Sequence, residues 1–308
     1  MTVLALSGGV GGAKLALGLA NILPAEDLLI VANTGDDFEH LGLSISPDLD
    51  TLMYALAGLD NQTLGWGRRD ETWSFMDTLA SIGGETWFRL GDRDLAVHIE
   101  RTRRRAGGES LTDVTAAFWR ALGIGPRGIP MTDDKVRTKV LAETGWIDFQ
   151  DYFVGQQCRP VVRALEFHGA DQARPHPALL AALTDPTLEA VVICPSNPFI
   201  SIEPILALPG VREALRTCNA PIIAVSPIIA GQAVKGPTAK MMTELGMIPS
   251  SAAVAARYAD FLDTIIIDSG DADEVDIIDC RVLLAPTLMK TLDDKIALAR
   301  IVLDAART

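Results

Sequence analysis

Short apolar runs recur along the chain and alternate with segments of helical period. Two runs lie near the start, at residues 3–6 and 28–32, and four follow residue 189, in "AVVICPSNP", "PIIAVSP", "TIIIDS" and "VLLAPT". Strands that are apolar throughout are typical of a sheet covered on both faces. Strands that alternate with helices form parallel sheets. The pattern therefore predicts an α/β fold with a mostly parallel sheet and helices on both faces.

The middle of the chain departs from this pattern. Residues 124–175 are richer in charge, and "RTKVLAETG" and "PVVRALEF" alternate apolar and polar residues. Such alternation is typical of strands with one exposed face. We expect a core formed by residues 1–123 and 176–308, and a smaller inserted or peripheral α+β region at residues 124–175.

Composition excludes several classes of protein. The 308 residues are 48% hydrophobic, which permits a sizeable core, and the net charge of −13 argues against a nucleic-acid partner. The sequence predicts no membrane span and no signal peptide. The four cysteines and four histidines have no metal-ligand spacing. We therefore expect a cytoplasmic protein with reduced thiols and no zinc.

The first apolar run leads into a glycine-rich turn, "SGGVGGAK". Glycine lets a ligand approach the backbone, and a helix that begins there presents unpaired N–H groups to an anion. A dinucleotide fingerprint would need glycine at Lys14, and a P-loop would need Ser or Thr at Leu15. We predict phosphate binding by Gly8, Gly9, Gly11, Gly12 and Lys14; a turn that serves packing alone is the alternative.

Four aspartates follow the second apolar run. Asp36 and Asp37 come directly after the strand, and Asp48 and Asp50 stand at the start of a predicted helix, which Ser46 or Asp48 could cap. Oxygen ligands beside a phosphate site suggest Mg²⁺. Turn formation and capping are the alternative for any one of them.

Three further segments combine polar or aromatic residues with turns. In "WFRLGDRD", arginines could meet phosphate and Trp87 or Phe88 could stack on a ring; "GWGRRDETW" adds arginines and tryptophans. Surface ion pairs are the alternative. Ser196 and Asn197, in "PSNPFISIEPI", form a rigid polar turn that could hold a nucleotide, and "SPIIAGQAVKGP" carries Lys235. Both could also be ordinary loops.

The sequence shows no arrangement for covalent catalysis. It suggests no Ser/His/Asp set and no cysteine in an activating context. The combination of glycine turn, carboxylates and arginines favours direct displacement at phosphorus, in which positioning and charge neutralisation lower the barrier.

Taken together, the motifs resemble the 2-phospho-L-lactate transferase family of coenzyme F(420) biosynthesis. Six stretches carry the resemblance, in the family's order: "SGGVGGAK", "NTGDDFEHLGLSISPDLDT", "GWGRRDETW", "WFRLGDRDLAVH", "PSNPFISIEPIL" and "SPIIAGQAVKGP". The resemblance spans nearly the whole chain. It implies a Rossmann-like core with a smaller added region, a homodimer and a requirement for Mg²⁺.

The resemblance also implies a reaction. Family members join the phosphate of a guanosine diphosphate-linked three-carbon acid to the terminal ribityl hydroxyl of the deazaflavin Fo (7,8-didemethyl-8-hydroxy-5-deazariboflavin). They release GMP and form coenzyme F(420)-0 or its dehydro form. Whether the acid is lactyl- or enolpyruvyl-2-diphospho-5'-guanosine, or derives from phosphoglycerate, is left open.

The residues matched by motif are few. Asp50 and Arg89 match positions that contact Fo, with Asp48 beside them, although the family often has lysine where Arg89 stands. Asp50 would also touch Mg²⁺ together with Asp37, and would orient or deprotonate the Fo hydroxyl. Two alternatives stay open: a non-catalytic regulator that binds nucleotide sugars on the same core, and a dinucleotide-dependent oxidoreductase, which the broken fingerprint disfavours.

Overall fold

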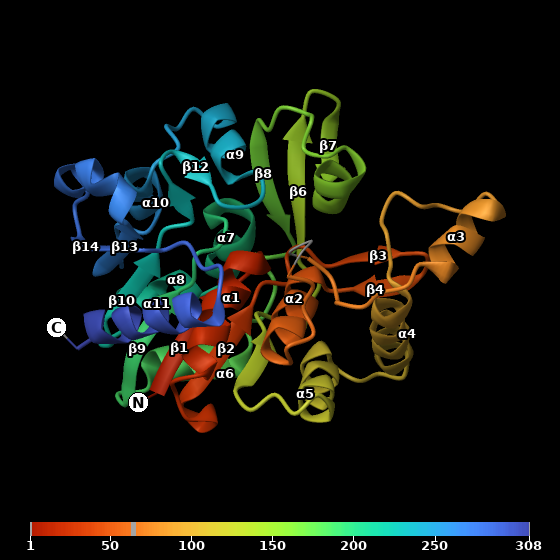
Figure 1. The fold of residues 1–308 in the computed structure, drawn as a ribbon, viewed down its shortest axis with the longest axis horizontal. Helices are drawn as coiled ribbons and strands as arrows, with labels where there is room; N and C mark the ends of the chain where they lie inside the picture. Colours follow the sequence, from red (N-terminus) through yellow and green to blue (C-terminus); the bar gives the residue numbers. More distant parts are fainter. Residues whose placement is uncertain (1, 63–65, 308) are drawn as a thin grey trace.

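A seven-stranded sheet forms the centre of the computed structural model, which describes residues 2–62 and 66–307 (Figure 1). Every pair of neighbouring strands in this sheet is parallel. In spatial order the strands are β14 (Arg281–Ala285), β13 (Thr264–Asp268), β10 (Ile222–Val225), β9 (Leu188–Ile193), β1 (Thr2–Ser7), β2 (Leu28–Ala32) and β5 (Arg127–Pro130). The predicted parallel sheet is confirmed.

The strand order reverses beside β1. From β1 the chain moves to β2 and β5 on one side, whereas β9, β10, β13 and β14 follow on the other side. This is the Rossmann order with one additional edge strand. In such sheets ligands bind outside the carboxyl ends of the strands, where the order reverses. The turns after β1 and β9 are therefore the expected walls of a site.

Helices cover both faces of the sheet because alternate residues of each strand point in opposite directions. Val3 and Ala5 pack in one apolar cluster, and Leu4 and Leu6 pack in the other. The first cluster includes α1 (Gly9–Ala20), α2 (Pro47–Leu56), α5 (Leu111–Ala121) and α11 (Leu292–Ala305). The second includes α6 (Pro177–Thr184), α7 (Glu203–Leu206), α8 (Val211–Arg216), α9 (Thr238–Glu244) and α10 (Ser251–Arg257).

Helices α1 and α11 approach each other closely at Gly18. A Cβ at this position would stand 2.2 Å from the carbonyl oxygen of Lys295. Only glycine therefore permits this distance between the two backbones. The contact places the first turns of α11 alongside α1, as Figure 1 shows.

A smaller antiparallel sheet stands beside the core. It consists of β7 (Gly145–Asp148), β6 (Arg137–Ala142) and β8 (Ala164–His168), and residues of β6 alternate between buried and half-buried. The boundary expected at residue 124 differs from the structure, because β5 pairs with β2 and belongs to the central sheet. Its short segment, "RGIP", is too brief to show a strand pattern.

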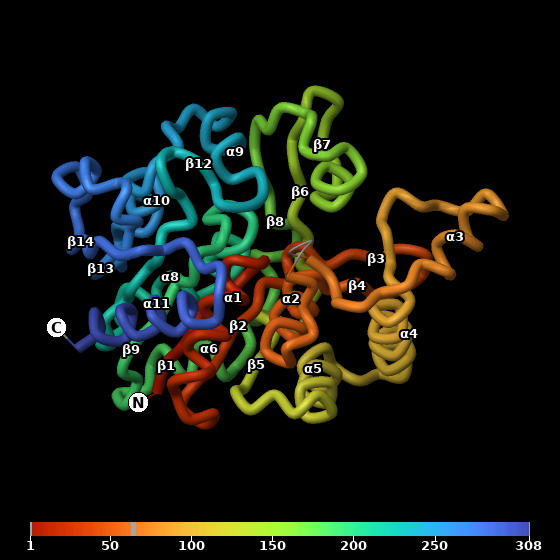
Figure 2. Tube along the Cα trace, viewed as in Figure 1, coloured from red at the N-terminus to blue at the C-terminus, as the bar shows by residue number. Residues whose placement is uncertain are grey.

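A second excursion lies between β2 and α5. It contains β3 (Phe38–His40), β4 (Leu43–Ile45), α3 (Ser74–Ser81) and α4 (Asp92–Ala106), and Figure 2 shows this part of the chain, orange to yellow, on one side of the core. Strands β3 and β4 form an antiparallel hairpin. Its turn residues, Leu41 and Gly42, have φ values of 52° and 73°, as a two-residue hairpin turn requires.

The remaining elements are short. They are β11 (Ile228–Ile229), β12 (Gln232–Ala233) and the helical turns η1 (Ala25–Asp27), η2 (Asp151–Gly155), η3 (Pro198–Ile202) and η4 (Ser269–Ile277). Among the helices of residues 2–62 and 66–307, none has both the length and the apolar character needed to cross a membrane.

Candidate active site

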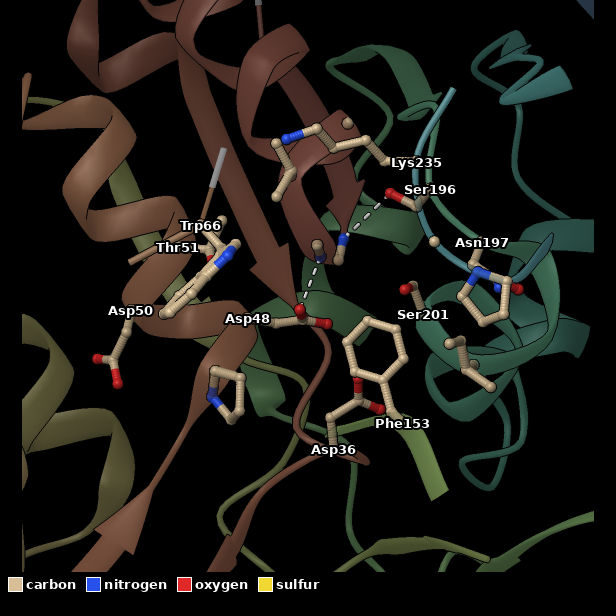
Figure 3. Close-up of a pocket in the computed structure, with 18 of the residues that line it drawn as sticks. Asp36, Asp48, Asp50, Thr51, Trp66, Phe153, Ser196, Asn197, Ser201 and Lys235 are labelled. Carbon is tan, nitrogen blue, oxygen red and sulfur yellow. Dashed lines mark hydrogen bonds between the residues drawn. The ribbon is translucent and has the colours of Figure 1, made fainter. Parts of the chain in front are cut away.

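A cavity of about 550 Å³ opens at the carboxyl ends of the central strands (Figure 3). Its walls include the glycine turn after β1, Asp36 after β2, the polar turn after β9, and Ser226 after β10. The structure thus brings together the segments that follow four strands of the central sheet. The described lining also includes five Phe, Tyr and Trp side chains: Tyr54, Trp66, Phe88, Phe149 and Phe153. The volume is typical of a small-molecule site.

The glycine turn is partly occupied by protein hydrogen bonds, drawn as dashed lines in Figure 3. Helix α1 begins at Gly9, where φ is +62°. The Gly8 N–H donates to Ser196 Oγ at 3.2 Å, and the Gly9 N–H donates to Asp48 Oδ1 at 2.7 Å. Val10 and Gly11 follow in the first turn of α1, where backbone N–H groups have no carbonyl acceptor within the helix. Both residues line the cavity, so they can offer donors to an anion.

Two glycines of the motif serve packing. A Cβ at Gly11 would stand 2.1 Å from the Pro195 carbonyl oxygen, and a Cβ at Gly12 would stand 2.5 Å from Ser7 Oγ. Helix α1 could not reach the turn after β9 with larger residues here. The packing alternative therefore holds for these positions, although Gly11 also lines the cavity and can offer its N–H to a ligand.

The polar turn after β9 lines the cavity but is also tied to the protein. Ser196 Oγ accepts the Gly8 N–H, and Asn197 Oδ1 accepts the Phe199 N–H at 2.9 Å, which caps η3. Lys14 also lines the cavity, and its Nζ donates to the Met289 carbonyl at 2.8 Å. These residues sit where nucleotide-binding residues were predicted; their contact with a nucleotide stays a prediction.

Asp36 and Asp48 present carboxylates to the cavity. Asp48 Oδ2 accepts a hydrogen bond from Asn33 Nδ2 at 2.9 Å, whereas Asp36 Oδ1 is buried without a hydrogen-bond partner in the described part of the chain. Burial raises the pKa of Asp48 to about 6. Burial, and then the charge of Asp48, raises the pKa of Asp36 well above its usual range. A divalent cation bound between two such carboxylates would offset the cost of burying their charge.

Asp37 lies outside this cavity. It is absent from the described lining, and its Oδ2 accepts a hydrogen bond from Ser46 Oγ at 2.8 Å. The capping predicted for Ser46 and Asp48 is wrong: neither side chain caps α2, because one binds Asp37 and the other binds Gly9. Asp37 therefore does not face a ligand that binds at the glycine turn.

Burial raises the pKa of Asp37 to about 7, against the favourable charge of Arg137. Between about pH 4 and 7 the native carboxyl retains a proton that the unfolded chain releases, so its contribution to stability is lost as pH rises through about 7. We expect Asp37→Asn, which stays neutral, to melt above wild type at pH 8 and to lose that advantage toward pH 5. Melting curves across this range test it; a pH-independent difference would contradict it.

Asp50 lines the cavity, but Arg101 of α4 binds its carboxylate. Arg101 Nη1 donates to Asp50 Oδ2 at 3.0 Å and Nη2 donates to Oδ1. Both side chains are buried. In Figure 3 the Asp50 carboxylate points away from Asp48 and Ser196. Of the two predicted metal ligands, Asp50 lines the cavity but pairs with Arg101, and Asp37 lies outside the described lining; metal binding by them stays a prediction.

His98 and Asp94 extend the Arg101 cluster. His98 Nδ1 lies 3.6 Å from Asp50 Oδ2, His98 Nε2 lies 3.2 Å from Asp94 Oδ2, and the Tyr54 hydroxyl donates to Asp94. Although Asp50, Asp94 and His98 bring ligand atoms within 4.8 Å of one another, the Arg101 guanidinium already supplies the positive charge between them. Sequence reasoning missed Arg101 and His98, because the charged pattern of α4 resembles that of an exposed helix.

Arg89 stands at the cavity as an exposed side chain. Its guanidinium lies 4.1 Å from the centre of the Trp73 ring, and Phe88 lines the cavity beside it. Trp87 is absent from the described lining and packs against His40 instead. Of "GWGRRDETW", Gly65 lies outside the described residues, whereas Trp66 lines the cavity.

The strand order and the position of the cavity define a Rossmann-like α/β protein with a ligand site where the strand order reverses. The sequence model of the family described as 2-phospho-L-lactate transferase CofD matches residues 3–281. The chain belongs to this family of transferases, as the sequence motifs indicated.

Curated relatives cover nearly the whole chain. A phosphoenolpyruvate transferase from Streptomyces griseus is 40% identical over 315 residues, covering 99% of this chain and 98% of the relative. A 2-phospho-L-lactate transferase from Methanosarcina mazei is 39% identical over 302 residues, covering 97% of this chain and 98% of the relative. A crystal structure of a UPF0052 family member from Bacillus halodurans has a TM-score of 0.63 at 13% identity, covering 98% of each chain, and shares the fold.

Proposed function

We propose that this protein transfers the phospho-acid moiety of a guanosine diphosphate-linked three-carbon acid to the ribityl hydroxyl of Fo and releases GMP. One observation carries the proposal: a single cavity joins a helix N-terminus and two buried carboxylates to a set of aromatic side chains. The helix N-terminus and the carboxylates suit a diphosphate and its cation. The aromatic side chains suit a flat ring. Relatives named for phosphoenolpyruvate and 2-phospho-L-lactate transfer support the same reaction.

The two ends of the cavity suit the two substrates. Val10 and Gly11 would donate backbone hydrogen bonds to the diphosphate, where the helix dipole adds positive charge. Phe149 and Phe153, whose rings stack at 5.4 Å, and Phe88 would contact the deazaflavin. Arg89 would bind an oxygen at the edge of the ring system. The hydroxyl of Fo would then meet the phosphorus between the two ends.

The carboxylates that fit Mg²⁺ are Asp36 and Asp48. They face the cavity, and Asp36 Oδ1 is a buried acceptor without a hydrogen-bond partner among residues 2–62 and 66–307. Bound there, Mg²⁺ would neutralise charge on the diphosphate as a Lewis acid. Asp48 would also fix the glycine turn through the Gly9 N–H. Asp50, with both oxygens held by Arg101, does not fit a metal in this arrangement.

The proposed transfer is a displacement at phosphorus. The hydroxyl oxygen of Fo forms a bond to the phosphorus that carries the acid and gives up its proton to solvent, while the bond from that phosphorus to the GMP oxygen breaks and GMP leaves. Asp50 remains the residue predicted to orient the hydroxyl, by accepting a hydrogen bond while Arg101 holds its carboxylate in place. The donors of α1 stabilise the charge that develops on the departing phosphate.

A direct assay tests this function. We expect purified protein with Fo, Mg²⁺ and either lactyl- or enolpyruvyl-2-diphospho-5'-guanosine to release GMP and form an equal amount of the deazaflavin product. The ratio of kcat/KM for the two donors identifies the acid. Excess EDTA should abolish turnover and added Mg²⁺ should restore it. Binding of both ligands without GMP release would instead favour a non-catalytic regulator.

A further inference from the structure

A second cavity of about 330 Å³ adjoins the first. The two share a wall that includes Val10 and Lys14 of α1, Thr51 of α2, and Lys235. Four lysines and one acidic residue line the second cavity: Lys14, Lys235, Lys290, Lys295 and Asp60. In a chain whose net charge is −13, this is a local excess of positive charge. We call it the lysine pocket.

Lys295 is the unusual member of this group. The residue is only 5% exposed, and its side chain lines the pocket. Lysine is rarely buried unless it is paired. Its backbone is held against α1 by the close approach at Gly18, so the side chain occupies a fixed place beside the pocket. The ammonium of Lys295 is therefore held at the wall of the pocket, where an anion in the cavity could pair with it.

The lysines of the pocket repel one another. Burial lowers the pKa of Lys14, and the nearby charges of Lys235 and Lys295 lower it further. Mutual repulsion of this kind is relieved by an anion that contacts several ammonium groups at once. Asp60 is the only acidic residue in the described lining, so the lysines outnumber the carboxylates of the pocket.

We propose that the lysine pocket is a second anion site that binds a phosphate group, either free or at the end of a nucleotide. A phosphate offers several oxygens and two negative charges, which suits three or four converging ammonium groups. The shared wall places the bound phosphate next to the main cavity. Lys290 and Lys295 line only the lysine pocket, whereas Lys14 and Lys235 also line the main cavity, and the nucleotide form of the ligand rests on the proposed function.

Lys295→Met tests the proposal, because methionine keeps an unbranched apolar side chain and removes the charge. By calorimetric titration with inorganic phosphate, we expect wild type to show a binding step that weakens by about tenfold or more in the variant. Arg300→Met, an exposed change of equal charge on the same helix, should leave this step unchanged. The variant without ligand should melt at or above wild type, because it removes a positive charge that repels Lys14.

Titrations with GMP and guanosine distinguish the source of the phosphate. If the site holds the nucleotide's phosphate, Lys295→Met weakens GMP but not guanosine, and inorganic phosphate competes with GMP. If the site holds free phosphate, inorganic phosphate and GMP bind at the same time. Either result supports the site. Lys290→Met, at the exposed rim, provides a second variant with little risk to folding. Unchanged phosphate binding in both variants, or a lowered melting temperature of Lys295→Met with unchanged binding, would overturn the proposal.

Discussion

Asp50→Asn is expected to lower the free energy of unfolding by about 3–5 kcal/mol, because it leaves the buried Arg101 guanidinium without its countercharge. Helix capping alone would predict almost no change, since asparagine caps as well as aspartate. Urea denaturation of wild type and variant measures the difference. If Asp50 also orients the Fo hydroxyl, turnover of the folded variant should fall by about 10²–10⁴-fold.

Two further variants distinguish the loss of the Asp50–Arg101 ion pair from the general effect of a lost charge on stability. Asp148→Asn removes a carboxylate that pairs with Lys139 at an exposed position, and it should cost less than about 1 kcal/mol. Asp50→Asn combined with Arg101→Met removes both charges and should recover part of the lost stability. A double variant that is less stable than the sum of its single changes would show that the pair is not what stabilises this region.

Asp48→Asn is expected to reduce turnover by about 10²–10³-fold and to raise the Mg²⁺ concentration needed for activity. The change keeps an oxygen that can accept the Gly9 N–H but removes the negative charge that faces the cavity. In wild type Asn33 Nδ2 donates to Asp48 Oδ2. In the variant an amide nitrogen can take the place of this oxygen, and two donors would then face each other. GMP release measured across a Mg²⁺ titration separates a weaker metal site from a lower maximal rate.

Asp37→Asn is the matched control for Asp48→Asn. Both aspartates are buried, but Asp37 binds Ser46 and lies outside the described lining of the cavity. We therefore expect near-normal turnover and an unchanged Mg²⁺ requirement in this control. The reverse outcome, with activity lost in Asp37→Asn and kept in Asp48→Asn, would favour the metal ligands predicted from the sequence over those that the structure brings to the cavity.

The sequence by itself determined the architecture of this protein and the place of its site. Each of the six apolar runs is a local signal, because a buried strand needs apolar residues on both sides. Parallel strands end at one edge of the sheet, so the polar and glycine-rich residues that follow them had to meet there. The glycine turn, Asp36 and Asp48, and Ser196 line one cavity for this reason.

The tertiary structure alone decided which partner each of these side chains has. Asp50 binds Arg101 from another helix, Gly11 contacts Pro195 from another strand end, and Lys295 faces Lys14 across two packed helices. Such pairs are separated by 50 to nearly 300 residues, and hydrophobic periodicity records only the direction in which a residue faces. The partners, and therefore which carboxylates remain open to a metal, follow from the packing of α2, α4, α1 and α11 against one another.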